Sequence, residues 1–249
     1  MMAISIAGFD PSGGAGILAD IKTFSALGVY GTSAITALTA QNVGRVSNIS
    51  PITPSFVEEQ IDLILEDLPI VFGKTGMLYS EEIILSVVKK IKEHSLKIVV
   101  DPVLVAGSGG SLSQKGMANT IKNNLLKEAI LTTPNVFEAE LLSGQEIKNK
   151  DDAIEAALTI GKNCDVVITG GHLDGDNIFF NGQISVMGGE LIESDNTHGS
   201  GCSFSAAITA YLIKGISMDK AIKKADIFVK ESIRHGSWGT LNQFWNLTD

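Results

Sequence analysis

The residues with the most suggestive chemistry form a glycine-rich turn that precedes a segment of helical periodicity. The turn consists of Gly199, Ser200, Gly201 and Cys202. Glycines let backbone N–H groups point toward one spot, and the positive end of a helix lies beside that spot, so the turn predicts an anion site. Phosphoryl transfer needs such a site, because negative charge on the transferred group must be stabilised.

Cys202 is the side chain of this turn that could take part in a reaction. A thiol at the N-terminus of a helix can have a lowered pKa, so we expect Cys202 to be a candidate general base for an acceptor hydroxyl. The alternative is a buried, inert cysteine after an ordinary loop, since short glycine motifs recur by chance.

A Walker-type phosphate loop is excluded by the sequence. Lys74 and Thr75 follow Gly73, but the glycine that the motif requires further upstream is missing. Any phosphates must therefore be held in another way.

A second glycine-rich turn, at residues 8–16, joins the first expected strand to the first expected helix. Its glycines allow the backbone to approach a small ligand closely. Asp20 follows one helical turn later, and a solvated helix carboxylate is the simpler interpretation of that residue alone.

Three oxygen-bearing side chains suggest a magnesium site. Asp101 ends an apolar run directly before a proline, and Asn135 and Glu138 lie one helical turn apart on one face. Magnesium takes oxygen ligands and needs only one or two carboxylates beside the phosphates of a nucleotide. Asn135 could also be a simple helix N-cap.

These residues need a sheet to bring them together. Strands are expected at residues 4–7, 33–38, 70–72, 98–100, 129–131 and 166–168, and helices at 14–27, 55–67, 81–94, 135–142, 151–162, 199–214 and 218–235. The alternation predicts an α/β fold, with a mostly parallel sheet and helices on both faces. Ligand sites in such sheets lie beyond the carboxyl ends of the strands.

Composition narrows the class of protein. The chain has 249 residues, 44% of them hydrophobic, and we expect one compact domain over residues 1–249. A net charge of -9, with basic residues interspersed among acids, argues against nucleic acid as a partner. Two cysteines without a Cys-x-x-Cys pair favour the reducing cytoplasm. No apolar run approaches the ~18 residues of a membrane span.

Five motifs together resemble the phosphomethylpyrimidine kinases of the ribokinase-like class. They are AGFDPSGGAGI at 7–17, KTGML at 74–78, DPV at 101–103, TPN at 133–135 and THGSGC at 197–202. The resemblance runs from about residue 4 to about residue 243. It implies a three-layer α/β/α sandwich and an enzyme that uses ATP and Mg²⁺. In thiamin biosynthesis that family phosphorylates hydroxymethylpyrimidine and then its monophosphate.

The resemblance also assigns roles to residues. It implies a pyrimidine pocket of Gly8, Ala15, Asp20, Gln41, Met77 and Val103. It implies a nucleotide site with Asn135, Thr169, Gly171 and Thr197, and it places Asp101 and Glu138 at the magnesium side. Cys202 would be the base, and the anion hole would consist of Gly199, Ser200 and Gly201. An amide at Gln41 can pair with an aminopyrimidine, and Met77 can cover its flat face. Core filling is the alternative for Met77. Segment 41–45 is a candidate flap, and a homodimer is expected.

Two positions depart from the family pattern. Many members carry lysines where this chain has Gly107 and Thr169, and either lysine would help to neutralise a triphosphate. Two other functions stay open. One is a pyridoxal or pyridoxine kinase, which shares the fold and acts on a related ring. The other is a non-catalytic pyrimidine-binding regulator.

Overall fold

A computed structural model describes residues 1–104 and 115–247, so Gly107 lies outside the described residues. Its centre is one nine-stranded sheet with the strand order β3-β2-β1-β4-β5-β6-β7-β8-β9. The strands are β1 (Met2–Phe9), β2 (Tyr30–Asn42), β3 (Arg45–Pro51), β4 (Phe72–Thr75), β5 (Lys97–Val100), β6 (Ala129–Thr132), β7 (Asp165–Ile168), β8 (Asn177–Phe180) and β9 (Ile184–Met187). From β2 to β7 every pairing is parallel, which confirms the expected mostly parallel sheet.

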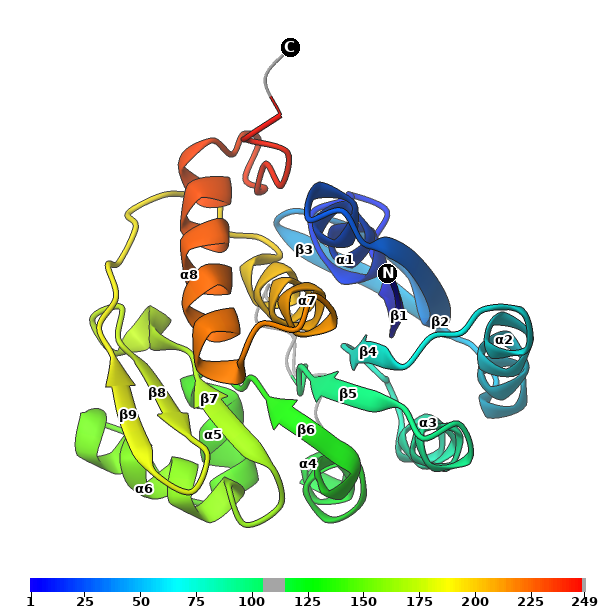
Figure 1. Cartoon of the computed structure of the whole chain (residues 1–249), viewed down its shortest axis with the longest axis horizontal. Helices are drawn as coiled ribbons and strands as arrows, with labels where there is room; N and C mark the ends of the chain where they lie inside the picture. Colours follow the sequence, from blue (N-terminus) through cyan, green and yellow to red (C-terminus); the bar gives the residue numbers. More distant parts are fainter. Residues whose placement is uncertain (105–114, 248–249) are drawn as a thin grey trace.

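Helices cover both faces of the sheet (Figure 1). One face carries α1 (Gly16–Ala26), α7 (Ser200–Ile213) and α8 (Met218–Arg234), and the other carries α2 (Pro54–Asp67), α3 (Glu81–Glu93), α4 (Lys115–Thr120), α5 (Val136–Ser143) and α6 (Lys150–Ile160). Short η segments lie at Ile121–Leu125, Leu126–Glu128 and Gly170–His172. The arrangement is the expected three-layer α/β/α sandwich.

Most side chains of the central strands are apolar because both faces of these strands are buried. In β5, Ile98 and Val100 join the core beneath α3, whereas Val99 joins the core beneath α7 and α8. Small side chains on α7, among them Ala206 and Ala210, let this helix pack between its neighbours α1 and α8.

All six expected strands and all seven expected helices are present, with small shifts at their ends. The strands β3, β8 and β9 and the short helix α4 were not expected. The three strands belong to the two antiparallel hairpins at the sheet edges. Edge strands such as β3 expose much of their surface to water, so they lack the apolar signal of a buried strand.

The parallel strands end along the same edge of the sheet, where α7 also begins (Figure 1). Several predicted site residues follow the carboxyl ends of β1, β4, β5, β6 and β7, so the fold gathers them along this edge; they are Ala15, Met77, Asp101, Asn135 and Thr169. Among the described residues, no helix combines the length and the apolar character needed to cross a membrane.

Candidate active site

The turn after β1 is held in shape by the carboxylate of Asp10, which is 3% exposed. One oxygen accepts the N–H of Ser12 at 2.8 Å, and the other accepts the N–H of Ala15 at 2.9 Å. The second oxygen also lies 2.8 Å from Nε2 of His198. Asp10 therefore joins the N-terminal glycine turn to the residue that precedes the anion turn.

The anion turn packs directly against the N-terminal turn. Gly199 has a φ of 91° and is the N-cap of α7. A Cβ at Gly199 would collide with the carbonyl oxygen of Gly14, and a Cβ at Gly14 would collide with the ring of His198. Only glycine fits at these two positions, which explains why both turns are rich in it.

The N–H groups at the start of α7 suit an anion. Ser200 donates to the carbonyl of Thr197 at 3.0 Å, and Ser203 donates to Gly199 at 2.9 Å. The N–H groups of Gly201 and Cys202 belong to the first helical turn, where helical geometry supplies no acceptor. They lie at the positive end of the helix dipole.

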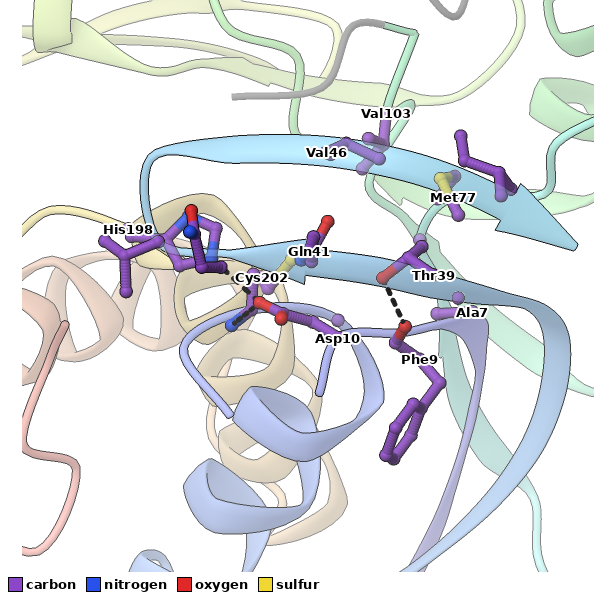
Figure 2. A pocket seen from close by; sticks show the side chains of 17 residues that line it. Ala7, Phe9, Asp10, Thr39, Gln41, Val46, Met77, Val103, His198 and Cys202 are labelled. Atoms are coloured by element: carbon purple, nitrogen blue, oxygen red, sulfur yellow. Dashed lines mark hydrogen bonds and ion pairs between the residues drawn. The ribbon is translucent and has the colours of Figure 1, made fainter. Parts of the chain in front are cut away.

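A cavity opens between the two turns and the hairpin β2–β3, and we call it the ring cavity (Figure 2). Five of the six residues predicted for the pyrimidine pocket line it: Gly8, Ala15, Gln41, Met77 and Val103. Cys202 lines it too. Its remaining walls are largely apolar and include Val46 and Ile49 of β3. Segment 41–45, the candidate flap, forms the tip of the β2–β3 hairpin beside this cavity.

Asp20 is not among the lining residues, and this corrects the expectation that it contacts the substrate. It is fully buried and accepts hydrogen bonds from Ser5 and from Lys74, whose Nζ lies 3.0 and 3.2 Å from its two oxygens. Nζ of Lys74 is also 3.7 Å from Oδ2 of Asp101. The simple interpretation of Asp20 as a solvated carboxylate is wrong as well.

Lys74 is a residue that sequence reasoning missed. It was considered as part of a phosphate loop and of the motif KTGML, without a role of its own. A lysine within a buried central strand is itself a signal, because such a charge needs buried partners. Burial acts to lower the pKa of Lys74. The charges of Asp20, Cys202 and Asp101, in that order of size, outweigh burial, so the pKa is raised above its usual value. The ammonium therefore stays protonated.

The expected lowering of the Cys202 pKa is wrong. Burial raises the pKa of the thiol to about 12, and the charges of Asp101 and Asp20 raise it as well. Lys74 acts in the opposite direction but does not outweigh them. Proximity to the end of a helix was the only influence visible in the sequence, whereas burial is the largest influence in the structure.

The acid pair lies in a second cavity, which adjoins the ring cavity and which we call the anion cavity. Asp101, Asn135 and Glu138 line it together with the anion turn. Burial raises the pKa of Glu138 to about 8, and the negative charge of Asp101 adds to that effect. Burial also raises the pKa of Asp101. A cation beside Asp101 and Glu138 would stabilise the ionised form of both carboxylates, which burial disfavours.

Asn135 is the N-cap of α5, as one interpretation anticipated. Its side chain accepts the N–H of Glu138 at 2.9 Å, and its own N–H donates to Oε2 of Glu138 at 3.0 Å. The same cavity contains the buried hydroxyl of Thr133, which has no hydrogen-bond partner among the described residues. Carboxylate, amide and hydroxyl oxygens are ligands that suit a hard divalent cation, so the residues present fit magnesium.

A groove continues from the anion cavity toward α8, and we call it the distal groove. Thr169 and Thr197 line both spaces, and Gly171 lines the distal groove. The ring cavity and the anion cavity in turn share Ala15, Val103 and Cys202. The three spaces are thus connected through common walls, and the thiol stands where the first two meet.

Comparisons with known proteins agree with this geometry. A family model described as phosphomethylpyrimidine kinase matches residues 10–243. A hydroxymethylpyrimidine/phosphomethylpyrimidine kinase of Bacillus subtilis is 42% identical over 94% of this chain and 89% of its own. The thiamine biosynthesis bifunctional protein ThiED of Geobacter sulfurreducens is 41% identical, and this chain spans about half of its length, 49%.

Two solved structures share the fold and confirm the expected class. The ADP complex of Bacillus subtilis pyridoxal kinase has a TM-score of 0.88 and 39% identity, and the match covers 98% of this chain and 94% of the other. The phosphomethylpyrimidine kinase of Clostridium difficile has a TM-score of 0.83 and 36% identity, and the match covers 94% of this chain and 99% of the other.

Proposed function

Because the chain belongs to the phosphomethylpyrimidine kinase family, we propose that it phosphorylates 4-amino-5-hydroxymethyl-2-methylpyrimidine and then its monophosphate with ATP, in thiamin biosynthesis. The chain is a kinase, and the substrates are the proposed part. The observation that carries the proposal is the position of Cys202, which lines both the ring cavity and the anion cavity. A hydroxyl on a ring in the first space faces a phosphoryl group in the second.

The ring cavity suits a flat heteroaromatic alcohol. Met77 covers one side so closely that a Cβ at Gly8 would collide with its terminal methyl group. Gln41 brings an amide to a wall that is otherwise mainly apolar. A flat ring with polar atoms on one edge is complementary to such a space.

The anion turn would hold the transferring group. Gly201 and Cys202 lie in the first turn of α7 and line the anion cavity, so N–H groups without an intrahelical acceptor are available to an anion there. They donate to phosphoryl oxygens, where negative charge increases during transfer. Thr169 and Thr197 lie toward the distal groove, where we place the rest of the nucleotide.

Asp101, Asn135 and Glu138 would hold the magnesium ion. A divalent cation there would neutralise the charge of Asp101, which together with burial, the larger cause, keeps the Cys202 thiol protonated. Lys74 then favours the thiolate, since its ammonium lowers the pKa of Cys202. The thiolate accepts the proton of the substrate hydroxyl as the phosphoryl group is transferred.

A pyridoxal kinase is the second candidate, and the overall similarity to the Bacillus subtilis enzyme favours it. ADP release should be measured with hydroxymethylpyrimidine, its monophosphate and pyridoxal as alternative substrates. We expect both pyrimidines to be phosphorylated at higher kcat/KM than pyridoxal. A clear preference for pyridoxal would contradict the first proposal and support the second.

The proposal includes a cytoplasmic homodimer. Both cysteines, Cys164 and Cys202, are free thiols, which suits a reducing compartment. Exposed apolar side chains on α2, Phe56 and Leu63, offer a surface for assembly. Sedimentation equilibrium should give twice the chain mass of 26.3 kDa, and a monomer at micromolar concentration would contradict the dimer.

A further inference from the structure

Basic side chains are scarce around the three connected spaces. Among the described residues that line the ring cavity, the anion cavity and the distal groove, Lys230 is the only lysine or arginine. Residues 105–114, which lie outside the described residues, contain neither lysine nor arginine. A nucleotide brings several negative charges on its phosphates, and Lys230 is the lining side chain that can offset part of them.

Lys230 lies on α8, which packs on β7 and β8 (Figure 1). Its Nζ donates to Oδ2 of Asp226, one helical turn earlier, at 2.6 Å, and its side chain is 15% exposed. An ammonium has three N–H donors, and this bond is the only one that Nζ makes within the described part of the chain. Two donors are therefore left for a ligand in the distal groove, which Lys230 lines.

A series of hydrogen bonds fixes the position of this ammonium. The other oxygen of Asp226 accepts from Nδ2 of Asn177 at 3.1 Å, and Oδ1 of Asn177 accepts the N–H of Gly170 at 2.8 Å. Asn177 is 5% exposed, and Gly170 follows β7 at the edge of the sheet where the site lies. A buried amide that is bonded at both ends makes the arrangement rigid. The ammonium is thus held at a fixed place beside the wall of the distal groove.

The second carboxylate that lines the distal groove, Glu190, does not compete for Lys230. Its Oε2 lies 2.5 Å from Nη2 of Arg234, which also contacts Glu231. Arg234 lies one turn further along α8 and is not among the residues that line the groove. Each carboxylate in the lining of the groove thus has its own basic partner, and the two unused donors of Lys230 stay available.

We infer that Lys230 binds the phosphate chain of the nucleotide in the distal groove, and that Asp226 and Asn177 hold its ammonium in place for that contact. The inference rests on the proposed function, because that proposal places the rest of the nucleotide in this groove. Hydrogen bonds from an ammonium to phosphate oxygens are about twice as strong as those between neutral groups.

Calorimetry with ADP in the presence of Mg²⁺ tests this contact without phosphoryl transfer. Lys230→Gln removes the charge, while its amide can still donate to Asp226 and glutamine is a good helix former. The Kd for ADP should rise by about 10- to 100-fold, as expected for a lost hydrogen bond to a charged group. KM for ATP should rise in parallel, whereas KM for the pyrimidine should stay within about twofold. An unchanged Kd for ADP would overturn the inference.

Two further variants separate the charge of Lys230 from its packing. Lys230→Arg keeps the charge and the ion pair, so its Kd for ADP should stay within about threefold of the wild type. Lys230→Gln combined with Thr169→Lys places a lysine in the same groove from the end of β7, and it should bind ADP at least about fivefold more tightly than Lys230→Gln alone. An equal loss in Lys230→Arg and Lys230→Gln, with no recovery in the double variant, would mean a merely structural role and would overturn the inference.

Lys220→Gln is the matched control. It removes the same charge from an exposed position of α8 that lines none of the three spaces. Its Kd for ADP and its KM for ATP should keep wild-type values. A loss of affinity as large as that of Lys230→Gln would mean that any positive charge on α8 suffices, and it would overturn the specific role of Lys230.

The same measurements separate this inference from the proposed function. A protein that binds ADP through Lys230 but phosphorylates neither pyrimidine contradicts the proposed function and supports the inference. A protein that phosphorylates both pyrimidines, while Lys230→Gln keeps the wild-type Kd for ADP, contradicts the inference alone. A wild-type protein that does not bind ADP contradicts both.

Discussion

Two lysines of this protein each contact two carboxylates, and the carboxylates lie at very different depths. Lys74 contacts Asp20 and Asp101, whose side chains are 0% and 6% exposed. The two carboxylates that contact Lys90 are 44% and 45% exposed. Water screens the second group and not the first. One lysine with two carboxylates thus forms a buried charge network at Lys74, but its carboxylates remain in contact with water at Lys90.

The surface group shows why acidic residues near one another do not by themselves make a metal site. Asp62, Glu93 and His94 have potential ligand atoms within 4.8 Å of one another. Lys90 already lies 2.7 Å from the first two, so its ammonium offsets part of their negative charge. Asp101 contacts Lys74, but Glu138 beside it makes no ion pair within the described part of the chain, so a cation at this pair would meet a carboxylate that no lysine or arginine offsets.

Removing the two lysines tests this comparison most severely. Lys74→Met would leave two carboxylates buried without a counter-ion, so the free energy of unfolding should fall by about 3–5 kcal/mol. Lys90→Met leaves solvated carboxylates and should cost about 1 kcal/mol or less. Urea denaturation of both variants measures the difference. Equal losses would show that depth does not decide the strength of these groups.

The two cysteines extend the comparison from stability to activity. The pKa of each thiol is raised to about 12 by burial, but only Cys202 lies near Lys74 and a cavity. Cys202→Ala should lower kcat by at least about 100-fold with little change in pyrimidine affinity, because the proton acceptor is lost. Cys164→Ala should keep wild-type kcat.

Replacing Cys202 by aspartate tests whether another proton acceptor can take the place of the thiol. Cys202→Asp should retain measurable turnover, because a carboxylate can accept the same proton. Full activity in Cys202→Ala, measured as ADP release, would exclude Cys202 as the general base.

The sequence could not reveal how deeply each charged side chain is buried. Strong apolar periodicity predicted the central strands and the long helices, and turns rich in glycine predicted the edge where the site lies. The family resemblance assigned Asp20 to the pocket, and the position of Asp20 on a helix says nothing about what lies beneath it. Whether Lys74 and Asp20 meet depends on the packing of α1 against β4, residues 54 positions apart.

The thiol of Cys202 and the Asp10–His198 pair show the same limit. The pKa of Cys202 is raised first by burial and then by the charges of Asp101, which follows β5, and of Asp20 on α1, and no local pattern in the sequence indicates either the burial or these distances. Asp10 and His198 each belong to a motif that the sequence made visible, but their contact requires the two turns to be adjacent. Sequence patterns located the motifs, and packing determined which side chains interact.

The acid pair offers a smaller effect, on metal affinity. Glu138→Gln removes one carboxylate from the proposed magnesium site but keeps the capping box of α5, since glutamine also accepts the N-cap N–H. The magnesium concentration for half-maximal activity should rise by about tenfold. Asp62→Asn, in the surface cluster, should not change it. An unchanged magnesium titration for Glu138→Gln would contradict the assignment.

Acid denaturation gives the smallest effect and compares a buried carboxylate with an exposed one. The folded-state pKa of Asp10 lies below its unfolded value near 4, so its contribution to stability is present above about pH 4 and is lost as the pH falls toward the folded pKa. Between pH 5 and pH 3 this loss should amount to about 1 kcal/mol in the wild type. Asp10→Asn should be less sensitive to acid over that range, whereas Asp62→Asn, whose carboxylate is exposed, should change the slope less. Parallel pH profiles of the unfolding free energy for the wild type and Asp10→Asn would mean that Asp10 is not held as an ionised buried carboxylate.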